Sequence, residues 1–209
     1  MSGQDKILDF VSLTKKSNLT ELVNLHIAAF PKFFLTRMGS EFLHEYYGEI
    51  LEYPGGIIHG IQIDGQLVGL SVGFMNPAVF YTRMSKRKLR YGRLVLKALL
   101  RQPSLVFRLL WNIQSFRSKG HRGGESDPSI CEWSSIAIHP DFKRIGVGRK
   151  LAEEFWLEAA IRGGRKVIGS TDAENNIDVI EFHSSVGFVE VGEYYAGGGR
   201  RMIALEKKL

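Results

Sequence analysis

The chain has 209 residues, of which 44% are hydrophobic and 24% charged, so it can bury a sizeable core and lacks the composition of a disordered segment. No apolar run reaches the about 18 residues of a membrane span, and the polar N-terminal residues lack the apolar core of a secretory signal. The net charge is +6, and the single cysteine, Cys131, excludes an intramolecular disulfide and a cysteine-built metal cluster. We therefore expect a soluble, cytoplasmic protein without a metal.

The first third of the chain predicts a strand, two helices and a hairpin. The expected elements are a strand over 8–13, a helix over 18–29 capped by Ser17 or Asn18, a helix over 40–51 capped by Ser40, and strands over 57–63 and 67–74. Asp64-Gly65, between the last two strands, is a strong signal for a two-residue hairpin turn.

Residues 78–124 form a basic segment. Between Gly65 and Gly124 there are twelve Lys and Arg and no Asp or Glu, so the rest of the chain has a net charge of −6. The pattern predicts two helices divided at Pro103, the second with Val106, Leu109, Leu110 and Ile113 at helical spacing, and then a loop over 119–127. In the first helix a stripe of basic residues recurs at steps of three or four. These residues are Lys86, Arg90, Arg93, Lys97 and Arg101.

The C-terminal half alternates strands with helices. We expect strands over 132–138 and 166–170, helices over 147–161 and 176–186, and strands over 188–195 and 202–205 around a glycine turn at 197–199. This alternation predicts a mixed α/β sheet, and the chain shows neither a repeat nor a linker. We expect one domain over 1–209 that contains the basic segment.

The stretch from Ile136 to Leu151 carries the clearest chemical signal. A strand leads into a basic, glycine-containing loop and then into a helix, whose first N–H groups have no partner within the helix and form its positive end. Gly146 and Gly148 open the backbone to a ligand, and Lys143, Arg144, Arg149 and Lys150 add positive charge. The combination predicts a site for an anion such as a pyrophosphate. The third glycine of a dinucleotide fingerprint and the hydroxyl–lysine pair of a Walker A loop are missing.

This loop resembles motif A of the GCN5-related N-acetyltransferases (GNAT), which has Arg or Gln, two residues, Gly, one residue, and Gly or Ala after the fourth strand. Lys143 stands in the place of the Arg or Gln, and Gly146 and Gly148 match the rest. The stretch from Asn176 to Phe188 resembles the second signature, an Asn before a short helix that ends in Gly-Phe. The resemblance implies a GNAT-like acyl-CoA N-acyltransferase fold: a mixed, mostly antiparallel central sheet of about seven strands flanked by helices, here with a basic helical insertion over 78–124.

The resemblance implies an enzyme that transfers the acetyl group of acetyl-CoA directly to a primary amine of a small molecule within a ternary complex. The N–H of Ile136 would polarise the acetyl carbonyl, and Asn176 would contact the cofactor or, alternatively, only cap its helix. The residues implied for the cofactor are Ile136, Ala137, Ile138, Lys143, Arg144, Ile145, Gly146, Val147, Gly148, Arg149 and Asn176.

The resemblance also implies catalytic residues. Glu132 lies eleven residues before Lys143, at the position of the base in the histone-acetylating members, and we expect Trp133 to line it. Ser134 shares its strand face and can orient a water or the acceptor. His183, where many members have a Tyr, is the candidate acid for the leaving thiolate. The alternatives are an exposed strand-end Glu and a helix-surface His.

Other residues have simpler expected roles. Cys131 is expected to be a small buried hydrophobe rather than a nucleophile. Asp172 and Glu174 follow a strand and either face the acceptor amine or lie in a solvated loop. The aromatic segment from Phe30 to Tyr47 is expected to shape the acceptor pocket.

The partners stay open at this stage. The basic insertion favours an amino sugar or sugar nucleotide as acceptor, with a protein amine as the competitor. A basic helix over 83–101 either packs on the domain with a solvated charged side or contacts an anionic membrane surface, which would make the protein peripheral to the membrane. A nucleic acid lacks a supporting motif, and a homodimer is compatible with the sequence. The alternative function is a non-catalytic acyl-CoA-binding or membrane-surface regulatory module.

Overall fold

The computed structural model describes residues 9–13, 18–103, 126–196 and 199–209. The chain forms two compact units, which we describe separately. The first unit contains residues 1–73 and 135–158, and the second contains residues 74–134 and 159–209. The single domain expected over 1–209 stays a prediction.

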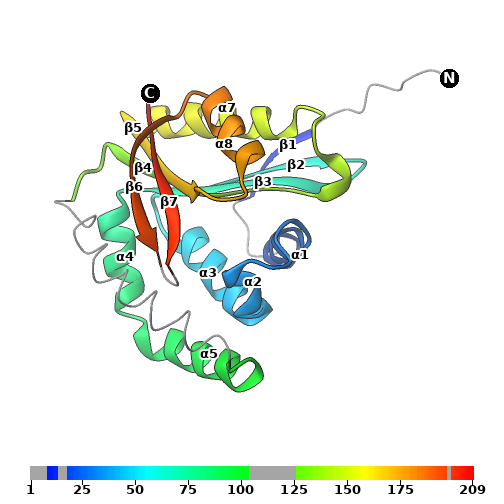
Figure 1. Ribbon diagram of the computed structural model, residues 1–209, viewed down its shortest axis with the longest axis vertical. Helices are drawn as coiled ribbons and strands as arrows, with labels where there is room; N and C mark the ends of the chain where they lie inside the picture. Colours follow the sequence, from blue (N-terminus) through cyan, green and yellow to red (C-terminus); the bar gives the residue numbers. More distant parts are fainter. Residues whose placement is uncertain (1–8, 14–17, 104–125, 197–198) are drawn as a thin grey trace. The chain divides into compact units, whose positions relative to one another are not determined.

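The described strands form one seven-stranded sheet in the order β1-β2-β3-β4-β5-β7-β6 (Figure 1). The strands are β1 (Asp9–Ser12), β2 (Gly56–Ile63), β3 (Gln66–Met75), β4 (Ile130–Ile138), β5 (Lys166–Asp172), β6 (Val189–Ala196) and β7 (Arg200–Lys208). β4 and β5 are parallel, whereas β1 with β2, β5 with β7 and β6 with β7 are antiparallel. The mixed, mostly antiparallel sheet of about seven strands is confirmed.

The helices lie between these strands along the chain. They are α1 (Leu19–Ala29), α2 (Phe34–Arg37), α3 (Ser40–Glu52), α4 (Pro77–Ser85), α5 (Lys88–Arg101), the 3₁₀ turn η2 (Pro140–Phe142), α7 (Val147–Ile161) and α8 (Ile177–Ser185). In the described part of the chain, no helix is both long enough and apolar enough to cross a membrane.

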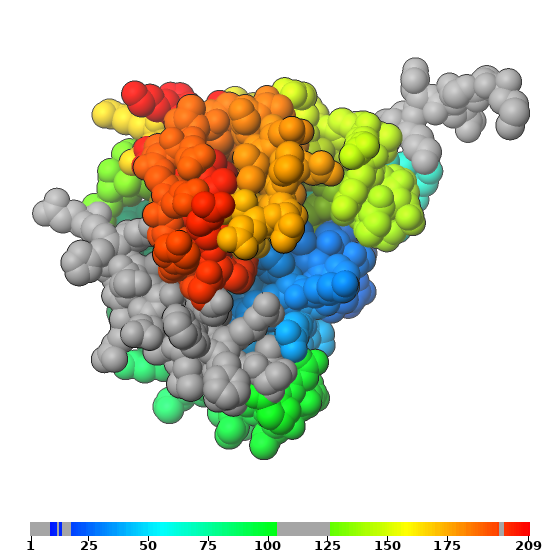
Figure 2. All heavy atoms as spheres, in the orientation of Figure 1, coloured from blue at the N-terminus to red at the C-terminus, as the bar shows by residue number. Residues whose placement is uncertain are grey.

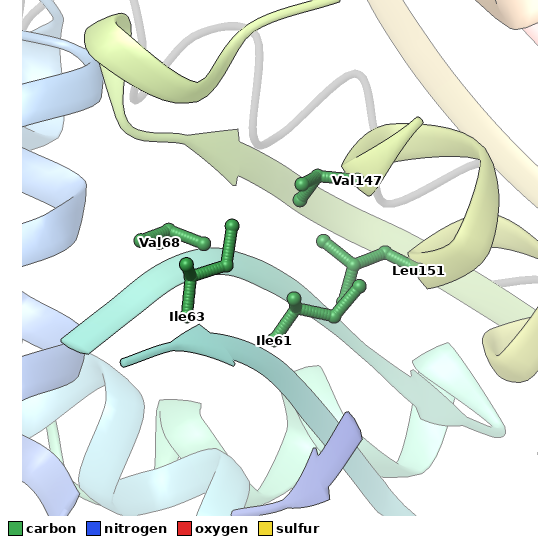
Figure 3. Close-up of a cluster of buried hydrophobic side chains, with 5 residues drawn as sticks. All are labelled: Ile61, Ile63, Val68, Val147 and Leu151. Atoms are coloured by element: carbon green, nitrogen blue, oxygen red, sulfur yellow. The ribbon is translucent and has the colours of Figure 1, made fainter. Parts of the chain in front are cut away.

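The core of the first unit joins α7 to the hairpin of β2 and β3. In Figure 1, α7 covers one face of β1–β3, and α1 and α3 cover the other. Val147 and Leu151 of α7 point onto Ile61, Ile63 and Val68 of the hairpin (Figure 3). The hairpin turns at Asp64-Gly65, where both residues have the positive φ of a type I′ turn. Burial of these branched side chains fixes the start of α7, and with it the loop that precedes this helix.

The second unit packs aromatic side chains on both sides of the first half of β4. Trp133 stacks on Phe188 with ring centroids 5.7 Å apart and also contacts His183 of α8. Phe74 at the end of β3 stacks on Phe80 of α4 at 3.8 Å. Successive strand residues point to opposite faces, so α4 and α8 contact different faces of β4.

Several boundaries differ from the sequence-based expectations. Ser40 does not cap α3, since the cap residue is Gly39 with φ of 98° and Ser40 is the first residue of the helix. The chain also divides between α4 and α5, before the break expected at Pro103. The predicted helix beyond Pro103 and most of the expected loop over 119–127 lie outside the described residues, as do two residues of the glycine turn.

Candidate functional site

The end of β4 is held in the first unit by its side chains. Ala137 is buried, and Ile136 and Ile138 pack with Phe142 against the core under α7. The N–H of His139 donates to the carbonyl of Val68 at 2.8 Å, which ties the strand end to β3. A ligand at this end of β4 would therefore meet the backbone of residues 136–138, not their side chains.

The loop before α7 has the geometry of an open anion cradle. Gly146 has φ of 90°, and a Cβ built on it would meet no atom within 4 Å. The ladder of the helix begins with the N–H of Lys150 donating to the carbonyl of Gly146, so the amides of residues 147–149 precede it. Val147 and Gly148 are buried, which fixes these amides at the positive end of α7.

The charges around this cradle are exposed. The side chains of Lys143, Arg144, Ile145 and Arg149 are open to solvent, and Arg144 has a positive φ of 64°. The ammonium group of Lys150 forms an ion pair with Glu154, one turn further along α7, at 2.7 Å. Lys150 therefore contributes less positive charge to the cradle than its sequence position suggests. The loop combines several cations, a helix start and an uncovered glycine, which suits a phosphate or pyrophosphate.

The remaining predicted site residues lie in the second unit, where β4 is in register with β5 over three residue pairs. These pairs are Ile130 with Lys166, Cys131 with Val167, and Glu132 with Ile168. Both strands extend further, to Ile138 and to Asp172. Glu132 therefore lies at the last position of this parallel ladder.

Glu132 is half-buried and accepts a hydrogen bond of 2.7 Å from the hydroxyl of Tyr81 on α4. Trp133 does not line this carboxylate, because it follows directly in the strand and packs against α8 on the other face. Ser134 is half-buried and returns to the face of Glu132. Sequence reasoning missed Tyr81, since no spacing links a helix residue to a strand residue 51 positions later.

His183 is buried in the aromatic cluster, which excludes the helix-surface alternative. Its ring centroid lies 5.6 Å from that of Trp133 and 5.5 Å from that of Phe188. Its Nδ1 lies 2.6 Å from the carbonyl oxygen of Val179, and a carbonyl can only accept, so Nδ1 carries a proton. Burial lowers the pKa of His183, and the imidazole is therefore neutral near pH 7 with a lone pair on Nε2.

Asn176 and Asp172 connect β5 to its neighbours. Asn176 stands at the N-cap position of α8 without a side-chain capping bond, and its amide donates to the Thr171 hydroxyl at 2.7 Å and the Asp172 carbonyl at 3.1 Å. Asp172 accepts hydrogen bonds from the guanidinium of Arg200 at 2.6–2.9 Å. Both side chains thus have structural partners in this unit.

Cys131 is fully buried, as expected. Burial is the main cause that raises the pKa of its thiol to about 12. The thiol is therefore protonated near neutral pH and is not an activated nucleophile.

A buried polar network crosses the first unit. Tyr47 of α3 is fully buried and its hydroxyl lies 2.6 Å from Nδ1 of His26 on α1. Burial raises the pKa of Tyr47, and a hydrogen bond with Ser135 of β4 lowers it by less. Burial lowers the pKa of His26 to about 4. Tyr47 therefore belongs to the core, although its aromatic segment was expected to shape a pocket.

Within the described residues, no group of three or more His, Cys, Asp or Glu side chains is placed to hold a metal ion. The loop before α7 belongs to the first unit, whereas Glu132, Ser134, Asn176 and His183 belong to the second. The predicted site residues thus fall into two sets, the anion-site candidates of the first unit and the acid–base candidates and Asn176 of the second.

No protein-family model matches the chain, and no curated protein matches it by sequence. Solved structures do match. An acetyltransferase of the GNAT family from Streptococcus pneumoniae is 13% identical with a TM-score of 0.61, and the match covers 97% of this chain and 99% of that one. A ribosomal-protein-alanine N-acetyltransferase from Brucella melitensis is 17% identical with a TM-score of 0.63, over 97% and 100% of the chains.

A third match is a protein from Salmonella typhimurium whose structure holds acetyl-CoA as its cofactor. It is 14% identical with a TM-score of 0.59, and the match covers 97% of this chain and 94% of that one. These matches cover nearly the whole of each chain at low identity. The fold that the sequence motifs implied is therefore the fold that the structure has.

Proposed function

We propose that this chain, which has the fold of the GNAT acetyltransferases, is an N-acetyltransferase that uses acetyl-CoA to acetylate a primary amine of a small molecule. The observation that carries the proposal is the open cradle before α7, where Gly146 has a positive φ and nothing stands over its Cβ position. A comparable fold holds acetyl-CoA in the Salmonella typhimurium structure.

The residues of the cradle fit the pyrophosphate of acetyl-CoA. We assign its binding to Lys143, Arg144 and Arg149, with the amides of residues 147–149 at the start of α7. The backbone of residues 136–138 would bind the amide-bearing arm, and Asn176 is proposed as a further contact. Bound there, acetyl-CoA supplies an acetyl group activated as a thioester.

The residues of this chain then act on protons and charge. Glu132 Oε2 would accept the proton that the amine loses, while Tyr81 holds Oε1 at 2.7 Å. Ser134 would orient the amine or a water, and the N–H of Ile136 would stabilise the oxyanion. Direct transfer needs no nucleophile on the protein, which agrees with the protonated thiol of Cys131.

The acceptor that we propose carries an anionic group beside its amine. Tyr81 brings α4 to Glu132, and the same segment bears only positive charges from Arg83 to Arg101. Asp172, the carboxylate closest to the end of β5, is bound by Arg200 and does not favour a cationic substrate. A sugar nucleotide, or an amino sugar that carries a phosphate, meets this requirement better than a basic peptide.

The first experiment measures acetyl-CoA binding by calorimetric titration. Gly146→Asp should abolish binding, because it places a carboxylate in the cradle. The matched control is Gly163→Asp, since Gly163 has φ of 84° and an equally open Cβ position at the other end of α7. Unchanged binding by G146D, or equal losses in both variants, would contradict the proposal.

The second experiment measures thiol release from acetyl-CoA with amino sugars, sugar nucleotides and alanine-ended peptides as acceptors. Glu132→Gln should lower kcat by about 100-fold or more and leave acetyl-CoA binding intact. The control is Glu206→Gln, a half-buried strand glutamate that pairs with Lys166. Turnover of peptides alone would overturn the small-molecule assignment.

One observation favours the alternative of a non-catalytic acyl-CoA-binding module. The neutral His183 keeps its proton on Nδ1, against Val179, and has none on Nε2 for a leaving thiolate. The role of His183 as an acid therefore stays a prediction, and it requires the imidazolium form. Binding of acetyl-CoA without turnover of any amine would establish the module, and turnover that survives His183→Phe would remove His183 from the mechanism.

A further inference from the structure

Helix α5 exposes apolar side chains that a helix packed on a domain would bury. Ala98 is the buried residue of this helix, at 3% exposed, and Leu94 and Val95 on the same side are half-buried. In contrast, Leu89 is 87%, Leu96 59% and Leu100 77% exposed. The helix therefore has apolar side chains on two faces, of which one is largely buried and the other is exposed.

The three exposed leucines form a single line, which we name the leucine ridge. They are spaced seven and four residues apart, and at about 100° per residue this places them within about 40° of each other. The ridge runs from Leu89 to Leu100, about 16 Å along a 14-residue helix whose full length is about 21 Å. The side chains of α5 (green) are at the surface in Figure 2.

Positive charges flank the ridge on both sides. Arg93, Lys97, Arg90 and Arg101 follow it around the helix in a strip about 80° wide, and all four are exposed. Lys88 lies on the other side and is also exposed. No Asp or Glu occurs between Gly65 and Gly124, so the segment that contains α5 is basic throughout.

The leucine ridge and the Lys and Arg residues beside it together indicate which class of partner fits α5. A nucleic acid would use the cations but would leave the leucines in water. A second copy of α5 would cover the leucines but would bring two cationic strips together. An anionic lipid bilayer accepts both, because apolar side chains enter the acyl boundary while cations meet the head groups.

We propose that α5 is an interfacial helix that lies in the plane of an anionic lipid membrane, with the leucine ridge inserted and the flanking Lys and Arg on the phosphates. This inference does not rest on the proposed acetyl transfer, since the leucine ridge contains none of the residues assigned to acetyl-CoA or to proton transfer. It does assign to the membrane those α5 cations that were counted above toward an anionic acceptor. It resolves the two interpretations of the basic helix in favour of contact with a membrane surface.

The test is co-sedimentation of the full chain with vesicles of phosphatidylcholine alone and of phosphatidylcholine with phosphatidylglycerol. We expect binding to the anionic vesicles at least about tenfold stronger, and weaker binding at higher salt. Leu89→Ser/Leu96→Ser/Leu100→Ser should reduce this binding by about tenfold or more. The matched control is Leu157→Ser/Ile161→Ser, which removes two exposed apolar side chains from α7.

A second variant, which changes only charged residues, tests whether the flanking Lys and Arg contact the lipid phosphates. Lys88→Gln/Arg93→Gln/Arg101→Gln removes three exposed cations and should abolish the preference for anionic vesicles. If the triple serine variant failed to fold by circular dichroism, Leu89→Ser alone, at the most exposed position, would take its place. None of these measurements depends on turnover, so an inactive enzyme would leave the result interpretable.

Three outcomes would overturn the proposal. The first is an absence of binding to anionic vesicles by the folded wild type. The second is salt-dependent binding to RNA that the serine substitutions leave unchanged, which would assign the cations to a polyanion. The third is a dimer, seen by light scattering, that the serine substitutions dissociate, which would assign the leucine ridge to a second copy.

Discussion

Tyr81 positions the carboxylate that we assign as the base. Its hydroxyl donates to Glu132, and a hydrogen bond to a charged group contributes about 1.5–3 kcal/mol. Tyr81→Phe should therefore lower kcat by about tenfold or more without changing the Kd of acetyl-CoA. The measurement is steady-state kinetics together with calorimetric titration.

The control for this substitution is Tyr195→Phe. Tyr195 is 71% exposed on β6, so loss of its hydroxyl should leave both constants unchanged. A Tyr81→Phe enzyme with wild-type kcat would show that Tyr81 has no part in positioning Glu132. A loss of acetyl-CoA affinity would instead assign Tyr81 to cofactor binding.

His26 makes the stability of the protein depend on pH. Its pKa falls from 6.5 to about 4 on burial, so between these values the unfolded chain binds more protons than the folded one. Lowering the pH from 7.5 to 5 should therefore reduce the free energy of unfolding by about 2 kcal/mol through this residue. Urea unfolding of the wild type and His26→Gln at both pH values isolates the effect.

The comparison of the two proteins is necessary because burial also lowers the pKa of His183, which titrates in the same direction. His183 is present in both proteins, so its contribution cancels in the difference. An equal loss of stability in the wild type and in His26→Gln would mean that His26 is not the group that titrates.

At the level of residues, the sequence motifs predicted the loop residues of the site, but they did not predict which distant side chains contact each other. The glycine and the cations of the cradle could be recognised from the spacing of a few neighbouring residues. In the structure Gly146 has a positive φ, a backbone conformation that favours glycine. The neighbour of Glu132 could not be predicted, because Tyr81 reaches it from a separate helix. The partner of Asp172 is Arg200 of β7, which is 28 positions away in sequence and is adjacent only through strand pairing.

At the level of elements, Gly69 allows α7 to approach β3 closely. A Cβ at Gly69 would lie 2.5 Å from Val147 Cγ1 and 2.9 Å from Leu151 Cδ1. These side chains are buried and Val147 is β-branched, so they have little room to move. Gly69→Ala should reduce the free energy of unfolding by about 1–3 kcal/mol, as measured by urea unfolding.

Gly92→Ala provides the opposite expectation for the same chemical change. Gly92 lies inside α5, and a Cβ built there meets nothing within 4 Å. Because alanine has the higher helix propensity, this variant should gain about 0.5–1 kcal/mol or show no loss. A destabilisation by Gly92→Ala equal to that of Gly69→Ala would contradict the packing argument.

Elements with strong local signals were predicted well. The helix over 147–161 and the hairpin at Asp64-Gly65 match, because apolar periodicity and turn chemistry act over a few residues. The break between α4 and α5 was missed, since Lys86-Arg87 offers no glycine or proline to mark it. The exposure of Leu96 could not be predicted either, because periodicity shows which residues share a face but not which face is covered.

At the level of the whole molecule, the order of strands is not a local property. β7 inserts between β5 and β6, and β4 is parallel to β5, whereas adjacent strands in the sequence suggested only that a mixed sheet forms. The resemblance at two short motifs implied a mixed, mostly antiparallel sheet of about seven strands, but it did not give this order. The division into two compact units could not be predicted from composition. Its boundaries fall inside strands β3 and β4, where no linker marks them.

This division leads to a prediction about ligand-linked stability. If acetyl-CoA binds the loop before α7, it stabilises the folded first unit in proportion to its concentration over its Kd. At 100 times the Kd the gain is about 2.7 kcal/mol, which corresponds to a rise in Tm of roughly 5–10 °C for a chain of this size. Scanning calorimetry measures the shift.

The shape of the thermal transition then reports on how the two units are coupled. If they unfold together, the whole transition moves to higher temperature with acetyl-CoA. If they unfold separately, the transition of the first unit moves most, because the cradle lies in that unit and only the proposed contact with Asn176 lies in the second. Gly146→Asp should show no shift in either case, while Gly163→Asp should shift like the wild type. A shift that persists in Gly146→Asp would place the ligand elsewhere and would remove the main support for the proposed enzyme.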